Sequence, residues 1–487
     1  MFIDSGMKNK FFITTPIYYV NDVPHIGHAY TTIAADVLAR FHREQDENVF
    51  LLTGTDEHGL KIQHKAEEAG KEPQKFVDEI AGEFKNLWDK LEIKYDNFIR
   101  TTDSKHKEAV QKVLGTLYDK DAIYKGEYEG MYCVACEQFK NENELIEGRC
   151  PEHDIVVEKI KEECYLLKLG DIQQQLIEKI ENDEFAIRPE KYKKEILSFL
   201  ENEKLKDISI SRKNVKWGIP LPFDQDHTTY VWFDAFLNYL TGLGWDGNIS
   251  KLSSGSSESS TLGFWPADIQ LIGKDILRVH ATIWPAILMH LGIRLPKTLF
   301  VHGHLLSGGR KMGKTLGNVI SIDEMLEKFG MDGTRYLLMS AGTFGEDVDV
   351  TMERMIEKYN ADLANGLGNL VSRVLRLAQT SNFQFSIFNF QINSNDSIFQ
   401  LTEKTQLDEA LGRIQNIVRG DNRYIEDNKP WELMKFDKKK FEKVMNQLIH
   451  NLSAISEYLI PFMPETSEKI KKALETKKAE ILFPRIK

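Results

Sequence analysis

The sequence predicts an α/β fold in which a doubly wound parallel sheet is interrupted by a small inserted domain and followed by an all-α helical bundle. Strand and helix signals alternate along the first 120 residues, three cysteines fall within eighteen residues of one another, and strand signals vanish after about residue 351. Alternation of strands and helices is typical of parallel sheets, whereas apolar residues at helical spacing alone indicate a bundle.

The alternating pattern begins near the N-terminus. "KFFITTPIYYV" reads as a buried strand, "HIGHAYTTIAADVLARFHREQ" as a helix and "NVFLLTGTD" as a second strand. Ligands of such sheets bind beyond the carboxyl ends of the strands, so polar residues that directly follow a strand are candidates for a site.

The pattern breaks between residues 124 and 212, where short aromatic and charged segments and two charged helices stand. It resumes with "TTYVWFDAFLNYL" and "ADIQLIGKDILRVHATIWPAILMHLG". An insertion within one domain explains this more simply than three unrelated domains do. From residue 351 onward the apolar residues recur at helical spacing, which predicts the bundle.

Length and composition narrow the class of protein. A chain of 487 residues with 41% hydrophobic and 28% charged residues predicts two to four globular domains. No apolar run is long enough to span a bilayer, and the N-terminus lacks the apolar core of a signal peptide, so we expect a cytoplasmic protein without a membrane partner. A net charge of −11 argues against non-specific binding to DNA and leaves an RNA partner open.

The cysteines suggest a metal site. Cys133, Cys136, Cys150 and His153 give the spacing C-x2-C-x13-C-x2-H, in which two ligand pairs can share one tetrahedral Zn²⁺. Four protein ligands leave no open position, so the predicted zinc is structural. The alternative is a set of unconnected thiols, and Cys164 is expected to be a small buried residue.

"PHIGH" is predicted to start a helix after the first strand. His25 and His28 then share one helical face, and Gly27 leaves space for a flat base to approach the backbone. Two imidazoles at the positive end of a helix suit a phosphate group. The alternative is an ordinary polar helix start.

Two aspartates also follow predicted strands. Asp56 stands in "TGTDEHG" and Asp275 in "LIGKDI". A carboxylate there can accept from an amine or a ribose hydroxyl, although aspartate is also a common turn former.

Residues 308–315, "GGRKMGKT", match the phosphate-loop pattern G-x-x-x-x-G-K-[ST]. A phosphate loop needs a helix that starts at its Lys314 and Thr315, but the following "LGNVI" does not look like a first helical turn. The better helix start is Ser321, which can form a capping box with Glu324.

Together, "HIGH" after the first strand and a late Lys-Met-x-Lys resemble the two signatures of class I aminoacyl-tRNA synthetases, HIGH and KMSKS. The similarity extends over nearly the whole chain and is specifically to methionyl-tRNA synthetases, because "TTPIYYVN", "GTDEHG", the cysteine knuckle, "WGIPLP", "YVWFDA", "IGKDI", "FVHGHL" and "NRYIEDNKPW" follow in that family's order. The phosphate-loop match is then incidental: Gly313 and Thr315 replace the two serines of KMSKS.

The resemblance implies a fold and a reaction. It implies a Rossmann-like catalytic domain whose parts are 1–123, with HIGH, and 213–300, an inserted zinc-knuckle domain at 124–212, a KMSKS segment at 301–350 and an anticodon-binding bundle at 351–487. The implied reaction joins L-methionine to ATP, with Mg²⁺, and transfers methionine from the adenylate to the terminal adenosine of tRNA(Met).

The resemblance also implies roles for single residues. The catalytic residues would be His25, His28, Lys311 and Lys314, and Gly27, Gly273 and Asp275 would complete the ATP site. The methionine site would consist of Ile17, Tyr19, Asp56, Trp232, Ala235, Tyr239, Ile276, His280 and Trp284. Asn369, Arg373 and Trp431 would read the anticodon. The aromatic residues among them could instead be core residues, and Phe236 stands where relatives carry proline.

Other functions remain open at this point. A class I synthetase for cysteine, leucine or valine is one alternative, although the short insertion argues against the leucine and valine enzymes, which carry a large editing domain there. A non-catalytic tRNA-binding paralogue is another, because "KMGKT" departs from the signature. We expect a monomer.

Overall fold

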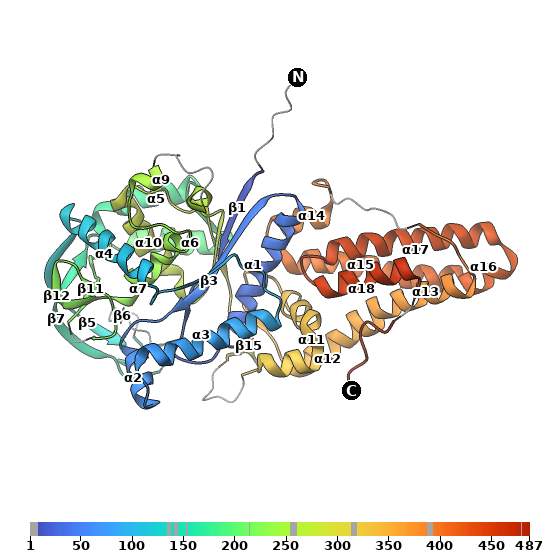
Figure 1. The fold of residues 1–487 in the computed structure, drawn as a ribbon, viewed down its shortest axis with the longest axis horizontal. Coiled ribbons are helices and arrows are strands. Elements are labelled where there is room, and N and C mark those ends of the chain that lie inside the picture. Colours follow the sequence, from blue (N-terminus) through green and yellow to red (C-terminus); the bar gives the residue numbers. More distant parts are fainter. Residues whose placement is uncertain are drawn as a thin grey trace, which may run out of the picture. The chain divides into compact units, whose positions relative to one another are not determined.

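The computed structural model describes residues 8–133, 138–140, 145–151, 154–213, 215–253, 261–312, 319–386, 393–478 and 480–487. The chain folds into two compact units (Figure 1). The first unit comprises Met1–Pro24, Val49–Leu87 and Tyr95–Val301, and the second comprises His25–Asn48, Trp88–Lys94 and His302–Lys487.

The first unit is built on a seven-stranded sheet with the strand order β2-β3-β1-β13-β14-β8, in which β4 also pairs with β3. The pairs β1/β13, β2/β3, β3/β4 and β14/β8 are all parallel, which confirms the predicted parallel sheet. Its strands are β1 (Lys10–Thr14), β2 (Tyr18–Tyr19), β3 (Asn48–Asp56), β4 (Asn97–Arg100), β8 (Ala186–Arg188), β13 (Ile269–Gly273) and β14 (Thr298–His302).

Helices cover the sheet because its strands carry consecutive apolar residues, whose side chains point to both faces. Phe12, Leu52 and Ile272 point into one buried cluster, which the apolar faces of α4 (Ser104–Asp119) and α10 (Leu277–Leu291) complete. The other helices of this unit are α2 (Leu60–Glu68), α3 (Pro73–Lys90), α5 (Gln173–Glu181), α6 (Glu190–Asn202), α7 (Val231–Phe236), α8 (Asn238–Thr241) and α9 (Ser250–Ser253), with short 3-10 turns η2 (Gly170–Ile172), η3 (Thr261–Phe264) and η4 (Lys274–Ile276).

The range predicted as an insertion contains a four-stranded sheet in the order β6-β5-β7-β9. Its long hairpin pairs β5 (Ile123–Cys133) with β7 (Glu158–Leu167) antiparallel, flanked by β6 (Gln138–Lys140) and β9 (Ile208–Ser209). However, β8 also falls in this range and pairs with β14 of the main sheet, so residues 124–212 do not form a separate layer throughout. A further small sheet joins β10 (Ser211–Arg212), β12 (Asp224–Thr229) and β11 (Pro220–Leu221).

The second unit is mainly helical. Its described part after residue 351 consists of helices and connecting segments, as the spacing of apolar residues predicted. The helices are α1 (Ile26–Glu44), α11 (Ile322–Met339), α12 (Met352–Lys358), α13 (Asn369–Thr380), α14 (Ser397–Glu403), α15 (Leu407–Asn428), α16 (Pro430–Phe436), α17 (Lys438–Leu459) and α18 (Pro464–Thr476). The strands β15 (Leu305–Ser307), β16 (Arg310–Lys311) and β17 (Val348–Asp349) form a small sheet.

A π-helix, η6 (Tyr359–Gly368), joins α12 to α13. In a π-helix the carbonyl five residues earlier lies beneath each position. A Cβ at Gly366 would lie 3.1 Å from the Ala361 oxygen, and one at Gly368 would lie 3.1 Å from the Leu363 oxygen. Both glycines therefore suit this wider helix, which the sequence did not predict.

A buried arginine fastens several elements of the second unit. Arg335 of α11 forms an ion pair with Asp36 of α1 at 2.7 Å, and both side chains are fully buried. Arg335 also donates to the backbone oxygens of Leu91, Pro461 and Phe462. Its charge and N–H groups thus have partners, and α1 is held to the turn that precedes α18.

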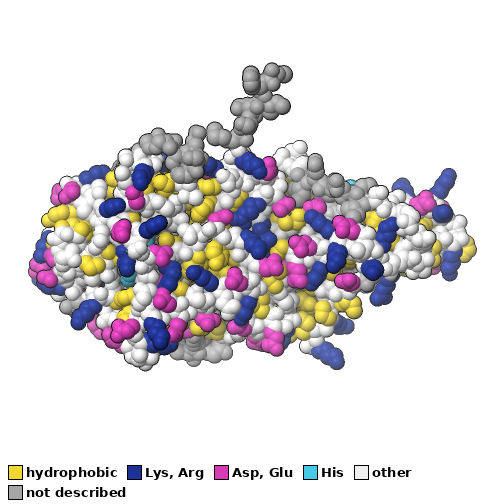
Figure 2. All heavy atoms as spheres, viewed as in Figure 1, with side chains coloured by type: hydrophobic (Ala, Val, Ile, Leu, Met, Phe, Trp, Pro, Cys, Tyr) yellow, Lys and Arg dark blue, Asp and Glu magenta, His cyan; other side chains and the backbone are white. Residues whose placement is uncertain are grey.

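Charges are mixed on the surface. Figure 2 shows lysine and arginine side chains interspersed with aspartate and glutamate side chains over the face that it draws. No helix among the described residues has both the length and the hydropathy of a membrane span.

Candidate active site

The two histidines of "HIGH" lie together at the N-terminus of α1. His25 is the N-cap residue, and the His25 and His28 rings stack with centroids 3.7 Å apart. Nδ1 of His25 accepts from the Gly27 backbone N–H at 3.1 Å, and Nδ1 of His28 accepts from the His25 backbone N–H at 3.2 Å. The two imidazoles therefore form the reciprocal capping box that serine and glutamate form in other helices.

This capping box determines the tautomers. Because Nδ1 of each ring is an acceptor, a neutral ring carries its proton on Nε2. Burial, followed by the neighbouring His25, holds the pKa of His28 well below its usual value, so His28 is neutral at physiological pH. A Cβ at Gly27 would approach the His25 ring to 3.0 Å, so glycine at this position leaves room for the ring.

The phosphate-loop pattern begins in a hairpin. Gly308 and Gly309 adopt φ values of 63° and 73° and form the two-residue turn between the antiparallel strands β15 and β16. Lys311 is the last residue of β16. Lys314 lies outside the described residues, so the meeting of the two lysines with the histidines stays a prediction. The next helix, α11, is capped by Ser321, whose Oγ accepts from the Glu324 N–H, as predicted.

Predicted methionine-site residues of the first unit gather around Phe236. The Phe236 ring lies 5.8 Å from Trp232, 4.9 Å from His280 and 5.9 Å from Trp284, between centroids. Tyr239 lies 5.7 Å from Trp284. We call these five residues, Trp232, Phe236, Tyr239, His280 and Trp284, the aromatic cluster. Phe236 is 2% exposed and fixes its neighbours by packing.

The imidazole of His280 and the hydroxyl of Tyr239 are both hydrogen-bonded within this buried region. Nδ1–H of His280 donates to the Ile276 backbone oxygen at 2.9 Å, so Nε2 accepts from the Tyr239 hydroxyl, also at 2.9 Å. Burial lowers the pKa of His280 to about 4, against a smaller opposing effect of the bond to Ile276. The same burial raises the pKa of Tyr239. The cluster is therefore uncharged at neutral pH.

Other predicted residues lie near the ends of sheet strands. Ile17 and Ile276 pack against the same core cluster as Trp232, and Ala235 lies beside Phe236 in α7. The remaining ones are Tyr19, which ends β2, Asp56, which ends β3, Gly273, which ends β13, and Asp275, in η4.

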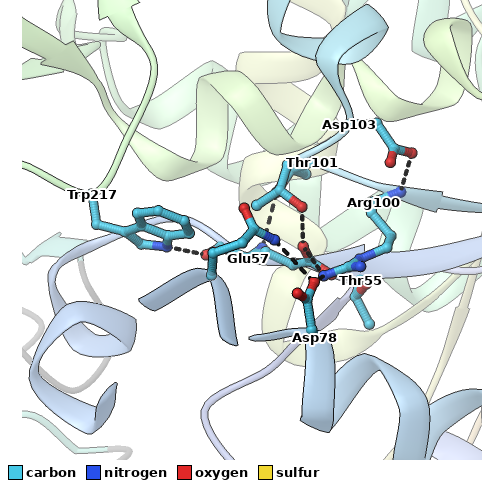
Figure 3. A network of polar contacts seen from close by, with 9 residues as sticks. Thr55, Glu57, Asp78, Arg100, Thr101, Asp103 and Trp217 are labelled. Atoms are coloured by element: carbon cyan, nitrogen blue, oxygen red, sulfur yellow. Dashed lines mark hydrogen bonds and ion pairs between the residues drawn. The ribbon is translucent and has the colours of Figure 1, made fainter. Parts of the chain in front are cut away.

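A buried polar network beside Asp56 was not predicted (Figure 3). The Glu57 carboxylate, fully buried, accepts from Arg100 Nε at 2.6 Å and Nη2 at 2.9 Å, and from Thr55 Oγ1 at 2.6 Å. Arg100 also pairs with Asp78 at 2.6 Å. "GTDEHG" contains Glu57, but the sequence gives no sign of whether an acidic residue after a strand faces a ligand or an internal arginine.

The candidates for anticodon reading lie on helices of the second unit. Asn369 and Arg373 are four residues apart on α13, hence on one face. Asn369 donates to Asn422 Oδ1 at 3.2 Å, and Arg373 pairs with Glu426 at 2.7 Å. Trp431 of α16 is 38% exposed, a large fraction for tryptophan, and offers a face for stacking.

Two of the four predicted zinc ligands are described. Cys133 and Cys150 are fully buried in one small cluster with Val157. Cys136 and His153 lie outside the described residues, and among the residues that are described no group of three or more metal-ligating side chains occurs. The two buried thiols fit the zinc site, which stays a prediction. Cys164 is fully buried, as expected.

The comparisons with known proteins agree with these features. A family described as class I tRNA synthetases (M) matches residues 11–159 and 153–375. A methionine–tRNA ligase of Clostridium acetobutylicum is 41% identical over 98% of this chain and 78% of its own length, and one of Rickettsia bellii is 40% identical over 98% and 95%.

Solved structures give the same result. The Mycobacterium tuberculosis methionyl-tRNA synthetase in complex with methionyl-adenylate superposes with a TM-score of 0.87 at 34% identity, covering 95% of this chain and 93% of that one. Its free form gives 0.81 at 29% identity, covering 100% of both chains. With HIGH at the start of α1 and matches over nearly its whole length, the chain belongs to the class I tRNA synthetases, in the methionyl-tRNA synthetase family.

Proposed function

We propose that this chain is a methionine–tRNA ligase, which activates L-methionine with ATP and transfers it to the 3′-terminal adenosine of tRNA(Met). The observation that carries the proposal is the uncharged aromatic cluster, in which His280 and Tyr239 satisfy each other's hydrogen bonds. A thioether offers only a weakly accepting sulfur, so a site for methionine must select by shape and by sulfur–aromatic contact.

In the first step the methionine carboxylate attacks the α-phosphorus of ATP. A bond forms between a carboxylate oxygen and phosphorus, and the bond to the bridging oxygen of pyrophosphate breaks. His25 and His28, with their protons on Nε2, donate to the phosphate oxygens at the positive end of α1. Lys311 and Lys314 supply the charge that stabilises the leaving pyrophosphate, and Mg²⁺, when bound with ATP, would neutralise phosphate charge.

The amino acid is held at two points. Asp56 accepts from the substrate ammonium, and the side chain lies against Trp232, Ala235, Tyr239, His280 and Trp284, with Ile17, Tyr19 and Ile276 at its edge. The rate depends mainly on how the two substrates are positioned, because the protein itself contributes little covalent chemistry. Gly27 leaves space for the adenine ring, and Gly273 and Asp275 face the adenosine side.

In the second step a ribose hydroxyl of the terminal adenosine attacks the methionyl carbonyl, and AMP leaves. Asn369, Arg373 and Trp431 read the anticodon by edge hydrogen bonds and stacking. Cys133, Cys136, Cys150 and His153 would hold one Zn²⁺, which would have a structural role. We further propose that the chain works in the cytoplasm as a monomer.

Amino-acid-dependent exchange of pyrophosphate into ATP tests this function without tRNA. We expect exchange with methionine and none with cysteine, leucine or valine. Exchange with another amino acid alone would assign the chain to a different class I synthetase, and exchange with none would favour a non-catalytic tRNA-binding paralogue.

A further inference from the structure

The three residues that follow Asp56, namely Glu57, His58 and Gly59, are each hydrogen-bonded to segments distant in the sequence. Glu57 is held by Arg100 and by threonines of neighbouring segments, as Figure 3 shows. Its backbone oxygen accepts from Trp217 Nε1 at 2.5 Å, and the Gly59 N–H donates to the Trp217 oxygen at 3.0 Å. The backbone that directly follows Asp56 is therefore fixed in place by hydrogen bonds on this side.

His58 is held by a second set of hydrogen bonds. Its Nδ1–H donates to Asp234 Oδ2 at 2.6 Å, and Asp234 Oδ1 accepts from His106 Nε2–H at 2.7 Å. The other ring nitrogen of His106, Nδ1, forms a hydrogen bond with Thr241 Oγ1 at 2.7 Å. The three side chains of His58, Asp234 and His106 are at most 5% exposed, so the chain of bonds is shielded from water.

Asp234 stays ionised in this place. Burial alone would raise its pKa, but the charges of His58 and His106 and their hydrogen bonds outweigh burial and lower the pKa of Asp234 to about 2. An ionised carboxylate is an acceptor only, and here it receives one N–H on each oxygen.

The position of Asp234 in α7 connects this network to the proposed methionine site. Asp234 lies directly before Ala235 and two residues after Trp232, and both belong to the proposed side-chain pocket. His58 lies two residues after Asp56, the proposed partner of the substrate ammonium. One hydrogen bond thus joins the segment that binds the amino group to the helix that binds the side chain.

We propose that Asp234 is a positioning residue for amino-acid binding: through His58 it fixes the separation between Asp56 and the pocket wall formed by Trp232 and Ala235. The inference rests on the proposed function, since it takes these residues as the two attachment points of methionine. A shift of about 1 Å between such points is enough to lower the rate by about a hundredfold.

The test compares His58→Ala and Asp234→Asn with the unaltered chain in pyrophosphate exchange. His58→Ala removes the hydrogen bond between His58 and Asp234 but leaves Asp234 its bond to His106. This second variant keeps the test decisive if Asp234→Asn fails to fold. We expect the KM for methionine to rise about tenfold or more, whereas the KM for ATP changes by less than about twofold. Asp421→Asn is the matched control, because it changes another buried aspartate, which is 5% exposed. This variant should leave the KM for methionine and the KM for ATP unchanged.

A second readout separates positioning from general loosening. Binding of methioninol, which keeps the ammonium, and of 4-(methylthio)butanoate, which lacks it, is followed by tryptophan fluorescence. In the variants, the Kd for methioninol should rise by about tenfold, and the Kd for 4-(methylthio)butanoate should change by less than about twofold. Equal losses for both ligands, or an unchanged methionine KM in folded variants, would overturn the inference. Failure of the unaltered chain to exchange with methionine would instead overturn the proposed function.

Discussion

The pKa of His280 gives a prediction for stability as a function of pH. Burial lowers this pKa from 6.5 to about 4, so the folded state binds a proton on His280 less readily than the unfolded state does. The neutral form is favoured by folding, and stability is therefore lost as the pH falls from 6.5 towards 4. Linkage between these two values gives a loss of about 2 kcal/mol between pH 7 and pH 5, and about 3 kcal/mol by pH 4.

His280→Gln isolates this contribution. Glutamine keeps an acceptor for the Tyr239 hydroxyl and a donor for the Ile276 oxygen, but it does not titrate. Urea unfolding of both proteins is followed by tryptophan fluorescence at pH 7, 6 and 5, because Trp232 and Trp284 lie in the same cluster. The difference in unfolding free energy between the two proteins should change by about 2 kcal/mol over this range. Parallel pH profiles would refute the reasoning that His280 is neutral because it is buried.

Three further predictions concern the second unit. Arg335→Leu should destabilise the chain by about 3 to 5 kcal/mol in urea unfolding, because the buried Asp36 loses one of its two arginine partners and three backbone oxygens lose their donor. Lys471→Leu, which breaks a partly exposed ion pair with Glu457, should cost less than about 1 kcal/mol, and equal costs for the two variants would contradict this account. Burial raises the pKa of Asp421 to about 6, so the protonated carboxyl is favoured by folding and stability should fall as the pH rises from about 4 to 6. Asp421→Asn should flatten that part of a calorimetric pH profile. A profile unaltered by the substitution would contradict the raised pKa. Gly368→Ala should strain η6, where the new Cβ meets the Leu363 oxygen, and raise the KM for tRNA severalfold with no effect on pyrophosphate exchange; a changed exchange rate would place the effect elsewhere.

Much of the fold could be predicted from the sequence because its signals are local. The buried runs around Phe12 and Leu52 indicated strands of a parallel sheet, and apolar spacing indicated the helices after residue 351. "HIGH" at the start of a helix was found in the same way, since a helix start follows from its neighbours.

The remainder depends on residues that are distant in the sequence. The pairing of β8 with β14 joins segments more than a hundred residues apart, and Asp234 meets His58 and His106 across similar separations. Nothing near Glu57 in the sequence indicates its pairing with Arg100, and nothing near Asp36 indicates its pairing with Arg335. The role of Phe236 as the centre of the aromatic cluster likewise emerges only from packing against α10.

We propose that the imidazoles at the N-terminus of α1 stabilise phosphate charge while separate residues bind the amino acid. Single-turnover formation of methionyl-adenylate by His28→Gln tests it most directly, with the methionine Kd measured in the same preparation. We predict that the rate constant falls by about a hundredfold or more while the Kd changes by less than about twofold. An unchanged rate constant, or a loss confined to methionine binding, would contradict the account.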